Sequence, residues 1–341
     1  MKVATVYIEI TNQCNLNCRT CYNRSGLNRQ PREISPRQLE ENILPLFTWY
    51  GCRRFLFSGG EPTLHRDFGE LLALIDAHPE LSFGIVTNGT RADERLLALL
   101  QRRDNFTLQV SLDGSCEEKN ALTRGPGNFE KALSFVRSVH MRRDKPRLKM
   151  VISQQNLDDV ESFYRLAVSC GCTPEYAFIY KSGNGVVDWE SKAVSPLQKL
   201  KVIRLVDRLN AEYGIDAFLP LCTFSCPLTG GLDDLSLCVK VDGSIQPCQS
   251  LYEEPFTLGN AFAFDEEAFL SRLDRIGSLA RARKNADYGC ARCLLREGCG
   301  RGCMAAAVYL HGDPLADDGD CQLRKMQFLG FTLKKEALTH G

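Results

Sequence analysis

Short apolar and β-branched runs alternate with longer amphipathic stretches along the chain as far as about residue 215. The short runs have the length and the composition of β-strands. We predict strands at 3–10, 54–57, 81–87, 106–112, 148–152 and 175–180.

The segment 35–51, SPRQLEENILPLFTWYG, illustrates the amphipathic stretches between these runs. Ser35 is a suitable N-cap, Pro36 suits the first helical position, and Gly51 ends an apolar pattern of helical period. Similar helical patterns follow at 66–79, 92–103, 128–140, 157–171 and 196–213. Six strands alternating with helices predict an α/β fold whose parallel sheet curves into a partial (β/α)6 TIM-like barrel.

The composition and the periodicity of the sequence change after the last of these helices. Nine of the sixteen cysteines lie beyond residue 215, among many glycines and with little periodicity. Such a loop-rich region needs cross-links, which metal clusters would supply. We therefore predict two domains, a barrel at 1–215 and a small cysteine-rich domain at 216–341.

Charge and composition exclude several classes of partner. The 42 basic and 42 acidic residues balance, so no electrostatic footprint for nucleic acid or an anionic membrane is expected. No apolar run reaches the length of a membrane span, and the N-terminus lacks the pattern of a signal peptide. We expect a cytoplasmic protein, whose thiols stay reduced, so that clustered cysteines indicate metal rather than disulfides.

Three cysteines form a cluster directly after the first predicted strand. Cys14, Cys18 and Cys21 have the spacing CxxxCxxC, with no fourth cysteine or histidine beside them. Zinc fits this set poorly because structural zinc takes four ligands and catalytic zinc usually includes histidine. A four-iron cluster held by three thiolates keeps one iron open for another ligand. Zinc or a purely structural role is the alternative.

The triad followed by Tyr22 resembles the signature of the radical S-adenosylmethionine (SAM) superfamily, and other motifs extend the resemblance. It implies that SAM binds the open iron and is cleaved reductively to a 5′-deoxyadenosyl radical. SGGE at 58–61 matches the motif that receives the methionine amino group, and VSLDG at 110–114 matches the ribose side. The resemblance implies SAM-binding roles for Gly59, Gly60, Glu61, Asn88, Ser111 and Arg124, with Arg124 meeting the SAM carboxylate.

The C-terminal cysteines resemble the SPASM extension of radical SAM maturases, which carries auxiliary four-iron clusters. CARCLLREGCGRGC begins at Cys290, and VDGSIQPC ends at Cys248. Two auxiliary clusters, three [4Fe-4S] clusters in all, are implied, and zinc is again the alternative. The ligands would be Cys290, Cys293, Cys299 and Cys321 for the outer cluster, and Cys222, Cys226, Cys248 and Cys303 for the inner one.

One choice among these ligands stays open. Cys222, Cys226 and Cys238 compete for two places, and we prefer the first two because Cys238 lies in an alternating strand pattern. The other four cysteines, which match no ligand spacing, are expected to pack as small hydrophobic residues: Cys52, Cys116, Cys170 and Cys172.

The resemblance implies an enzyme that removes a hydrogen atom from a peptide or protein residue and oxidises it, forming a cross-link, a thioether or a similar modification. Gln249 stands where sulfatase-activating relatives have an aspartate, which argues against that activity. The alternative enzyme acts on a small molecule or cofactor precursor such as a tetrapyrrole. A non-catalytic iron-sulfur electron carrier is disfavoured, because a carrier needs no SAM motifs.

The implied partners are a peptide or protein substrate and a reductant such as ferredoxin or flavodoxin. The first predicted strand starts at residue 3, so we expect no winged-helix peptide-recognition domain before it. Either a separate protein presents the peptide or the barrel itself recognises the substrate.

Overall fold

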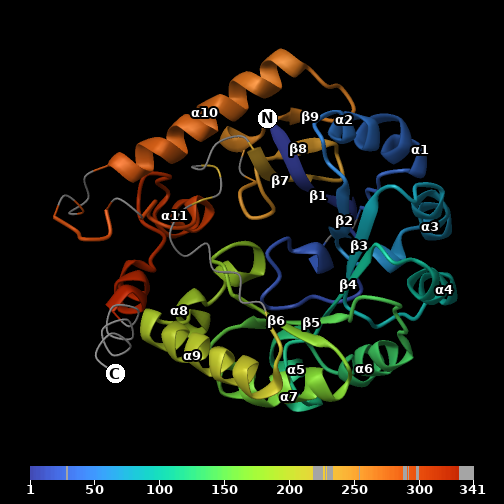
Figure 1. Cartoon of the computed structure of the whole chain (residues 1–341), viewed down its shortest axis with the longest axis horizontal. Helices are drawn as coiled ribbons and strands as arrows, with labels where there is room; N and C mark the ends of the chain where they lie inside the picture. The colour runs from blue at the N-terminus through green and yellow to red at the C-terminus, as the bar shows by residue number, and fades with distance from the viewer. Residues whose placement is uncertain are drawn as a thin grey trace.

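The structure is a computed structural model that describes residues 1–27, 30–217, 226, 228, 233–252, 254–286, 290, 292–296 and 299–329. One curved sheet runs through it (Figure 1). Its strands are β1 (Lys2–Thr11), β2 (Arg54–Gly59), β3 (Ser82–Thr87), β4 (Phe106–Ser111), β5 (Arg147–Ile152), β6 (Thr173–Phe178), β7 (Asp233–Val239), β8 (Ser244–Gln246) and β9 (Gly259–Asn260).

Helices lie around the outside of the curved sheet, and α10 and α11 stand across the view from α3 and α4 (Figure 1). The α-helices are α1 (Pro36–Gln38), α2 (Leu44–Trp49), α3 (Phe68–Ala77), α4 (Glu94–Arg102), α5 (Glu117–Arg124), α6 (Phe129–Ser138), α7 (Val160–Ser169), α8 (Trp189–Lys192), α9 (Pro196–Tyr213), α10 (Glu266–Asn285) and α11 (Met304–His311). None of the helices in the described part of the chain combines the length and the apolar composition that crossing a bilayer requires.

The strand order is β6-β5-β4-β3-β2-β1-β7-β8-β9, and β1 to β6 pair in parallel, which confirms the predicted partial barrel. The sheet continues past the six predicted units, because β7 pairs in parallel with the free edge of β1. The antiparallel strands β8 and β9 then complete it. The division at residue 215 stays a prediction, and the sheet is continuous across it.

The two faces of the sheet have different chemistry. The outward residues of β2 and β3, Phe55, Phe57 and Phe83, are fully buried against the helices, and the Phe83 ring centroid lies 5.9 Å from that of each of the other two. Such a side chain contributes about 1.5–3 kcal/mol by its burial. The alternate residues point to the barrel interior, where Arg54 and Ser58 line a cavity.

The helix ends follow the predicted capping chemistry. Ser195 and Gln198 form a capping box before α9, and Gly214 ends the helix with a left-handed φ of 62°. Ser35 caps the first helix in the same way, but its middle turn, Leu39–Ile43, is a π-helix. Pro45 follows this turn and has no N–H to donate into a regular α-helical ladder.

Candidate functional site

A cavity of about 720 Å³ lies inside the barrel and reaches the carboxyl ends of the strands. Three cysteines and six other residues singled out from the sequence all line it: Cys14, Cys18, Cys21, Gly59, Gly60, Glu61, Asn88, Ser111 and Arg124. These residues come from five separate chain segments. The parallel topology brings them together, because the carboxyl ends of all its strands meet at one rim.

The cysteine loop, residues 12–24, follows β1 and carries the three thiols. The Leu16 amide nitrogen lies 3.4 Å from Cys14 Sγ, and Asn88 Nδ2 donates toward the same sulfur at 3.9 Å. Burial raises the pKa of the Cys14 thiol to about 11 and that of Cys18 to about 12. Both groups are therefore neutral thiols at pH 7 until a cation displaces their protons.

This donor set fits an iron-sulfur cluster. The thiols line one cavity, and N–H groups point at a sulfur as they do around such clusters. Among the described residues, no three histidine, cysteine or carboxylate side chains converge as the ligands of a single metal ion would. Thiolates on different iron atoms of a cube stand further apart than the ligands of one ion.

Glu61 is buried at the end of β2 and is held by four donors. Its Oε1 accepts from Thr63 N, Thr63 Oγ1 and Thr87 Oγ1, and its Oε2 accepts from Asn88 N at 2.7 Å. Burial raises the pKa of Glu61, and these donors oppose that rise. Oε2 keeps acceptor capacity for one further group, such as an ammonium.

Gly59 and Gly60 let β2 pass close to the cysteine loop. Gly60 N donates to Thr11 O at 2.8 Å, and a Cβ at Gly60 would stand 1.8 Å from Gln13 O. Gly59 has a φ of 113°, which side-chain-bearing residues rarely adopt. The glycines therefore set the position of the backbone that leads into Cys14.

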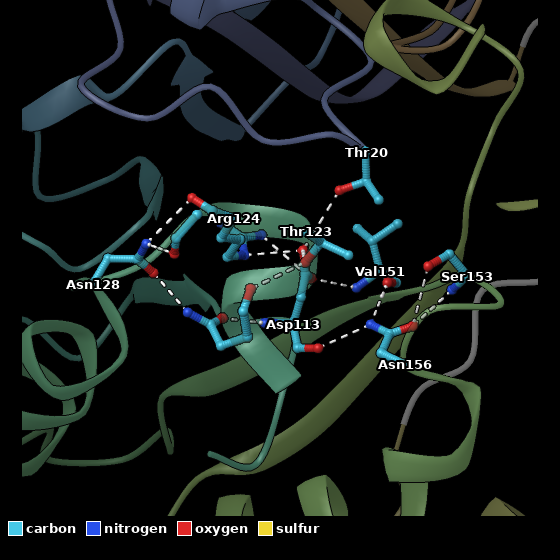
Figure 2. A network of polar contacts seen from close by, with 10 residues as sticks. Thr20, Asp113, Thr123, Arg124, Asn128, Val151, Ser153 and Asn156 are labelled. Carbon is cyan, nitrogen blue, oxygen red and sulfur yellow. Dashed lines mark hydrogen bonds and ion pairs between the residues drawn. The ribbon is translucent and has the colours of Figure 1, made fainter. Parts of the chain in front are cut away.

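Arg124 ends α5 and lies in a polar network centred on the fully buried Asp113 (Figure 2). Arg124 Nε is 3.0 Å from Asp113 Oδ2. Burial opposes the charge of Arg124, but Asp113 and then the Cys18 thiolate hold its pKa above the ordinary value. A positive charge therefore faces the thiols.

The network also fixes the cysteine loop to the barrel. Thr20 Oγ1 lies 3.5 Å from Asp113 Oδ2, and Arg19 N donates to Thr123 O at 2.7 Å. Val151 N donates to Asp113 Oδ1, so β5 belongs to the same network (Figure 2). Asp113 was noted in the VSLDG motif, but only the structure shows that it joins these elements.

A second anchor of the cysteine loop was missed from the sequence. Asn184 N donates to Cys21 O at 2.8 Å, and its side chain donates to Cys18 O. Lys192, which is 4% exposed, donates to the carbonyls of Arg19, Asn184 and Val187. No sequence pattern around Lys192 indicates which carbonyl groups its side chain contacts, so these partners could not be predicted.

Three of the C-terminal cysteines lie close together near the barrel. Burial raises the pKa of Cys248 to about 12, and the neighbouring Cys303 and Cys226 thiolates raise it further. Cys238 is also near Cys248, and Tyr7 opposite it in β1 lines the cavity. Cys222 lies outside the described residues, so the choice between Cys222 and Cys238 stays a prediction.

The predicted outer ligands lie in a separate group. Cys293 N donates to Cys290 O, which places these two cysteines in one turn. Burial raises the pKa of Cys321, and the Cys290 thiolate raises it further, which shows that the two lie near each other. Burial lowers the pKa of Arg324, but Asp318 and then the Cys299 and Cys321 thiolates hold it above the ordinary value. None of the described cysteines forms a disulfide.

Comparison with known proteins identifies relatives of the whole chain. The family model described as the radical SAM superfamily matches residues 8–167. The mycofactocin maturase MftC of Mycolicibacterium smegmatis is 30% identical over 92% of this chain and 81% of its own. The AdoMet-dependent heme synthase of Methanosarcina barkeri is 26% identical over 93% of this chain and 95% of its own.

Solved structures share the fold. Streptococcus suis SuiB bound to S-adenosylmethionine superposes with a TM-score of 0.74, at 17% identity, over 94% of this chain and 78% of its own. SuiB is also known bound to its precursor peptide SuiA, with a TM-score of 0.72. At this identity the likeness concerns the fold.

We expect Asp113→Asn to destabilise the protein strongly, because it leaves the buried Arg124 charge without its carboxylate. The free energy of unfolding should fall by about 3 kcal/mol. Urea denaturation measures the change. The matched control Asp158→Asn removes an exposed ion pair to Lys119 and should cost less than about 1 kcal/mol. Equal losses in the two variants would contradict the role given to the network.

Gly60→Ala should displace the cysteine loop, since its Cβ would overlap the Gln13 carbonyl. We expect reconstituted Gly60→Ala protein to hold about four fewer irons per chain than the wild type. Iron analysis and visible absorbance measure this. Gly259→Ala is the control, because a Cβ there meets nothing within 4 Å. Full iron content in Gly60→Ala would show that the close approach is unnecessary.

Proposed function

Because the chain belongs to the radical SAM superfamily, we propose that it is a maturase that oxidatively modifies a residue of a peptide or protein. The observation that carries the proposal is the single cavity, which contains all nine residues expected to hold the cluster and SAM. A relative with a maturase name that matches 92% of the chain supports the substrate class.

Three residues would hold the cluster, and the strand ends would hold SAM. When bound, the reduced cluster and SAM supply a 5′-deoxyadenosyl radical. The Cys14, Cys18 and Cys21 thiolates would be the ligands, with Glu61 Oε2 facing the methionine ammonium and Arg124 its carboxylate. Ser111 and Asn88 line the same wall and would contact the nucleoside side.

The remaining part of this chain's task is to orient the target and exclude water. A carbon radical attacks whatever C–H bond is within reach, so the barrel must hold the target carbon near the strand ends. The enclosing wall of strands β1 to β6 and the buried network behind Arg124 provide a rigid frame for this.

Two auxiliary clusters would accept the electron that the oxidised residue loses. The inner ligands are Cys226, Cys248 and Cys303 with either Cys222 or Cys238, and the mutual effect of three of these thiols supports the grouping. The outer ligands are Cys290, Cys293, Cys299 and Cys321. Ferredoxin or flavodoxin would reduce the first cluster. Either a separate protein would present the peptide or the cavity itself would recognise it.

A second candidate function is the modification of a cofactor precursor such as a tetrapyrrole. The match to an AdoMet-dependent heme synthase over nearly the full length of both chains favours it. The genes beside this one separate the candidates, because a short peptide gene supports the maturase and cofactor-biosynthesis genes support the alternative.

The first test is the formation of 5′-deoxyadenosine. Anaerobically reconstituted protein, reduced with dithionite and given SAM, should produce it, and Cys18→Ala should reduce the yield to that of a sample without protein. Chromatography of the nucleoside measures the yield. Cys170→Ala, which removes a thiol outside the clusters, should retain the wild-type yield. Protein with well-formed clusters that forms no 5′-deoxyadenosine would contradict the proposed enzymatic function.

The second test is the iron content of the auxiliary site. Cys248→Ala should lower iron and sulfide by about four atoms each per chain while the first cluster remains. Elemental analysis and electron paramagnetic resonance measure the two effects. Cys170→Ala again serves as the control. A Cys248→Ala protein with wild-type iron content would remove Cys248 from the ligand set.

A further inference from the structure

The cavity has a second charged region, separate from the residues expected to hold the cluster and SAM. Arg54 on β2 and Arg147 and Lys149 on β5 line its wall away from the cysteine loop. We call these three residues the basic floor. A parallel barrel usually fills this space with branched apolar side chains, so three cations here need a cause.

Strand alternation places the basic floor on the same face as the SAM-side residues. Arg54, Leu56 and Ser58 are successive inward residues of β2 and all line the cavity. Ser58 directly precedes the Gly59–Glu61 motif. Since a strand rises about 3.3 Å per residue, Arg54 lies about 13 Å from Ser58 along the strand, toward its amino end. A substrate of a few residues' length can therefore span from the floor to the strand ends.

The charges of the basic floor are only partly compensated. Glu175 on β6 accepts from Lys149 Nζ at 2.9 Å and lies 3.5 Å from Arg147. Asp216 lines the same wall but is exposed to solvent. Three cations thus face two carboxylates, which leaves one positive charge in excess.

Arg54 is the cation without a partner. No ion pair or side-chain hydrogen bond joins its guanidinium to the described residues, and its Nε is buried without a partner. A buried N–H group without a partner is unfavourable, so a ligand that accepts from it would gain affinity. The planar guanidinium suits a carboxylate, which accepts two parallel hydrogen bonds from it.

Hydroxyl groups line the same cavity as this guanidinium. They belong to Tyr7, Thr5 and Thr107, and the Arg54 charge acts on the Tyr7 hydroxyl. Burial raises the pKa of Tyr7, so its hydroxyl stays protonated and can donate a hydrogen bond. Arg54 and Tyr7 therefore form a donor group that would complement an anion.

We propose that the basic floor binds a carboxylate of the substrate through Arg54 and thereby selects substrates and positions their reactive carbon. The inference rests on the proposed function, since it gives that function's substrate a required chemical group. The carboxylate can be the C-terminus of a peptide or an acidic side chain. Either group would lie at the floor while the rest of the substrate extends toward the strand ends.

Probe binding to the reconstituted, SAM-loaded protein tests the proposal. The probes are N-acetyl-L-leucine, its neutral amide, and N-acetyl-L-glutamic acid α-amide, whose only carboxylate is in the side chain. Calorimetric or NMR titration should show that N-acetyl-L-leucine, the glutamate probe or both bind about tenfold more tightly than the neutral amide. The carboxylate probe that gains affinity identifies the source of the carboxylate.

Arg54→Gln should bring this affinity ratio to about one, and Arg54→Lys should keep part of it. Arg53→Gln is the matched control, because it removes an exposed arginine next in the chain and should keep the wild-type ratio. Thermal unfolding of each variant shows whether it folds. Wild-type protein that binds neither carboxylate probe more tightly than the amide overturns the proposal, and so does an unchanged ratio in folded Arg54→Gln.

The same preparation separates this proposal from the proposed function. Wild-type protein that forms 5′-deoxyadenosine but shows no preference for a carboxylate is a radical SAM enzyme without the proposed floor site. Protein that prefers the carboxylate but forms no 5′-deoxyadenosine keeps the floor site and loses the proposed chemistry.

Discussion

The buried ion pair between Asp113 and Arg124 is the interaction on which the site depends. The cysteine loop has no regular secondary structure, so its shape comes from contacts with its surroundings. Asp113 lies at the end of β4 and meets Thr20 of that loop, Thr123 and Arg124 of α5, and the backbone of β5. The Asp113 carboxylate is fully buried and accepts hydrogen bonds from several elements at once. It therefore fixes the positions of these elements relative to one another. The same pair aims a permanent positive charge at thiols that must become anionic.

The other side of the loop is held by backbone amides, an asparagine and a buried lysine. Gly60 and Glu61 join the loop to β2 through the carbonyls of Thr11 and Gln13, and Asn184 and Lys192 join it to the segment after β6. Loop residues 13–21 are thus anchored by strands on opposite sides of the barrel. Three thiols on an irregular segment can stay at fixed separations only under such constraints, which a metal cluster with a rigid geometry requires.

Local physics explains how much of this architecture could be predicted from the sequence. Strand patterns at β1 to β6 and the Ser35 cap of α1 depend on neighbouring residues, and they were predicted within a few positions. The motif residues could also be placed at the cavity, because parallel topology alone brings strand ends together. The pairing of β7 with β1 joins segments more than two hundred residues apart, and no local pattern specifies it. The partners of Lys192 and Asp113 are tertiary contacts of the same kind.

The basic residues on the inner face of the barrel were not predicted from the sequence, because the alternating patterns of β2 and β5 were used only to locate the strands. RFLFSG and RLKMVI alternate as half-buried strands do, and their polar positions would ordinarily face solvent. In a parallel sheet whose other face is covered by helices, those positions can face only the barrel interior. Arg54, Arg147 and Lys149 therefore line the interior cavity. A polar interior in a fold that favours apolar packing indicates a ligand rather than a core. The uncompensated charge at Arg54 then follows from the count of carboxylates on this wall, Glu175 and Asp216. That count turns a pattern of alternation into a statement about substrate chemistry.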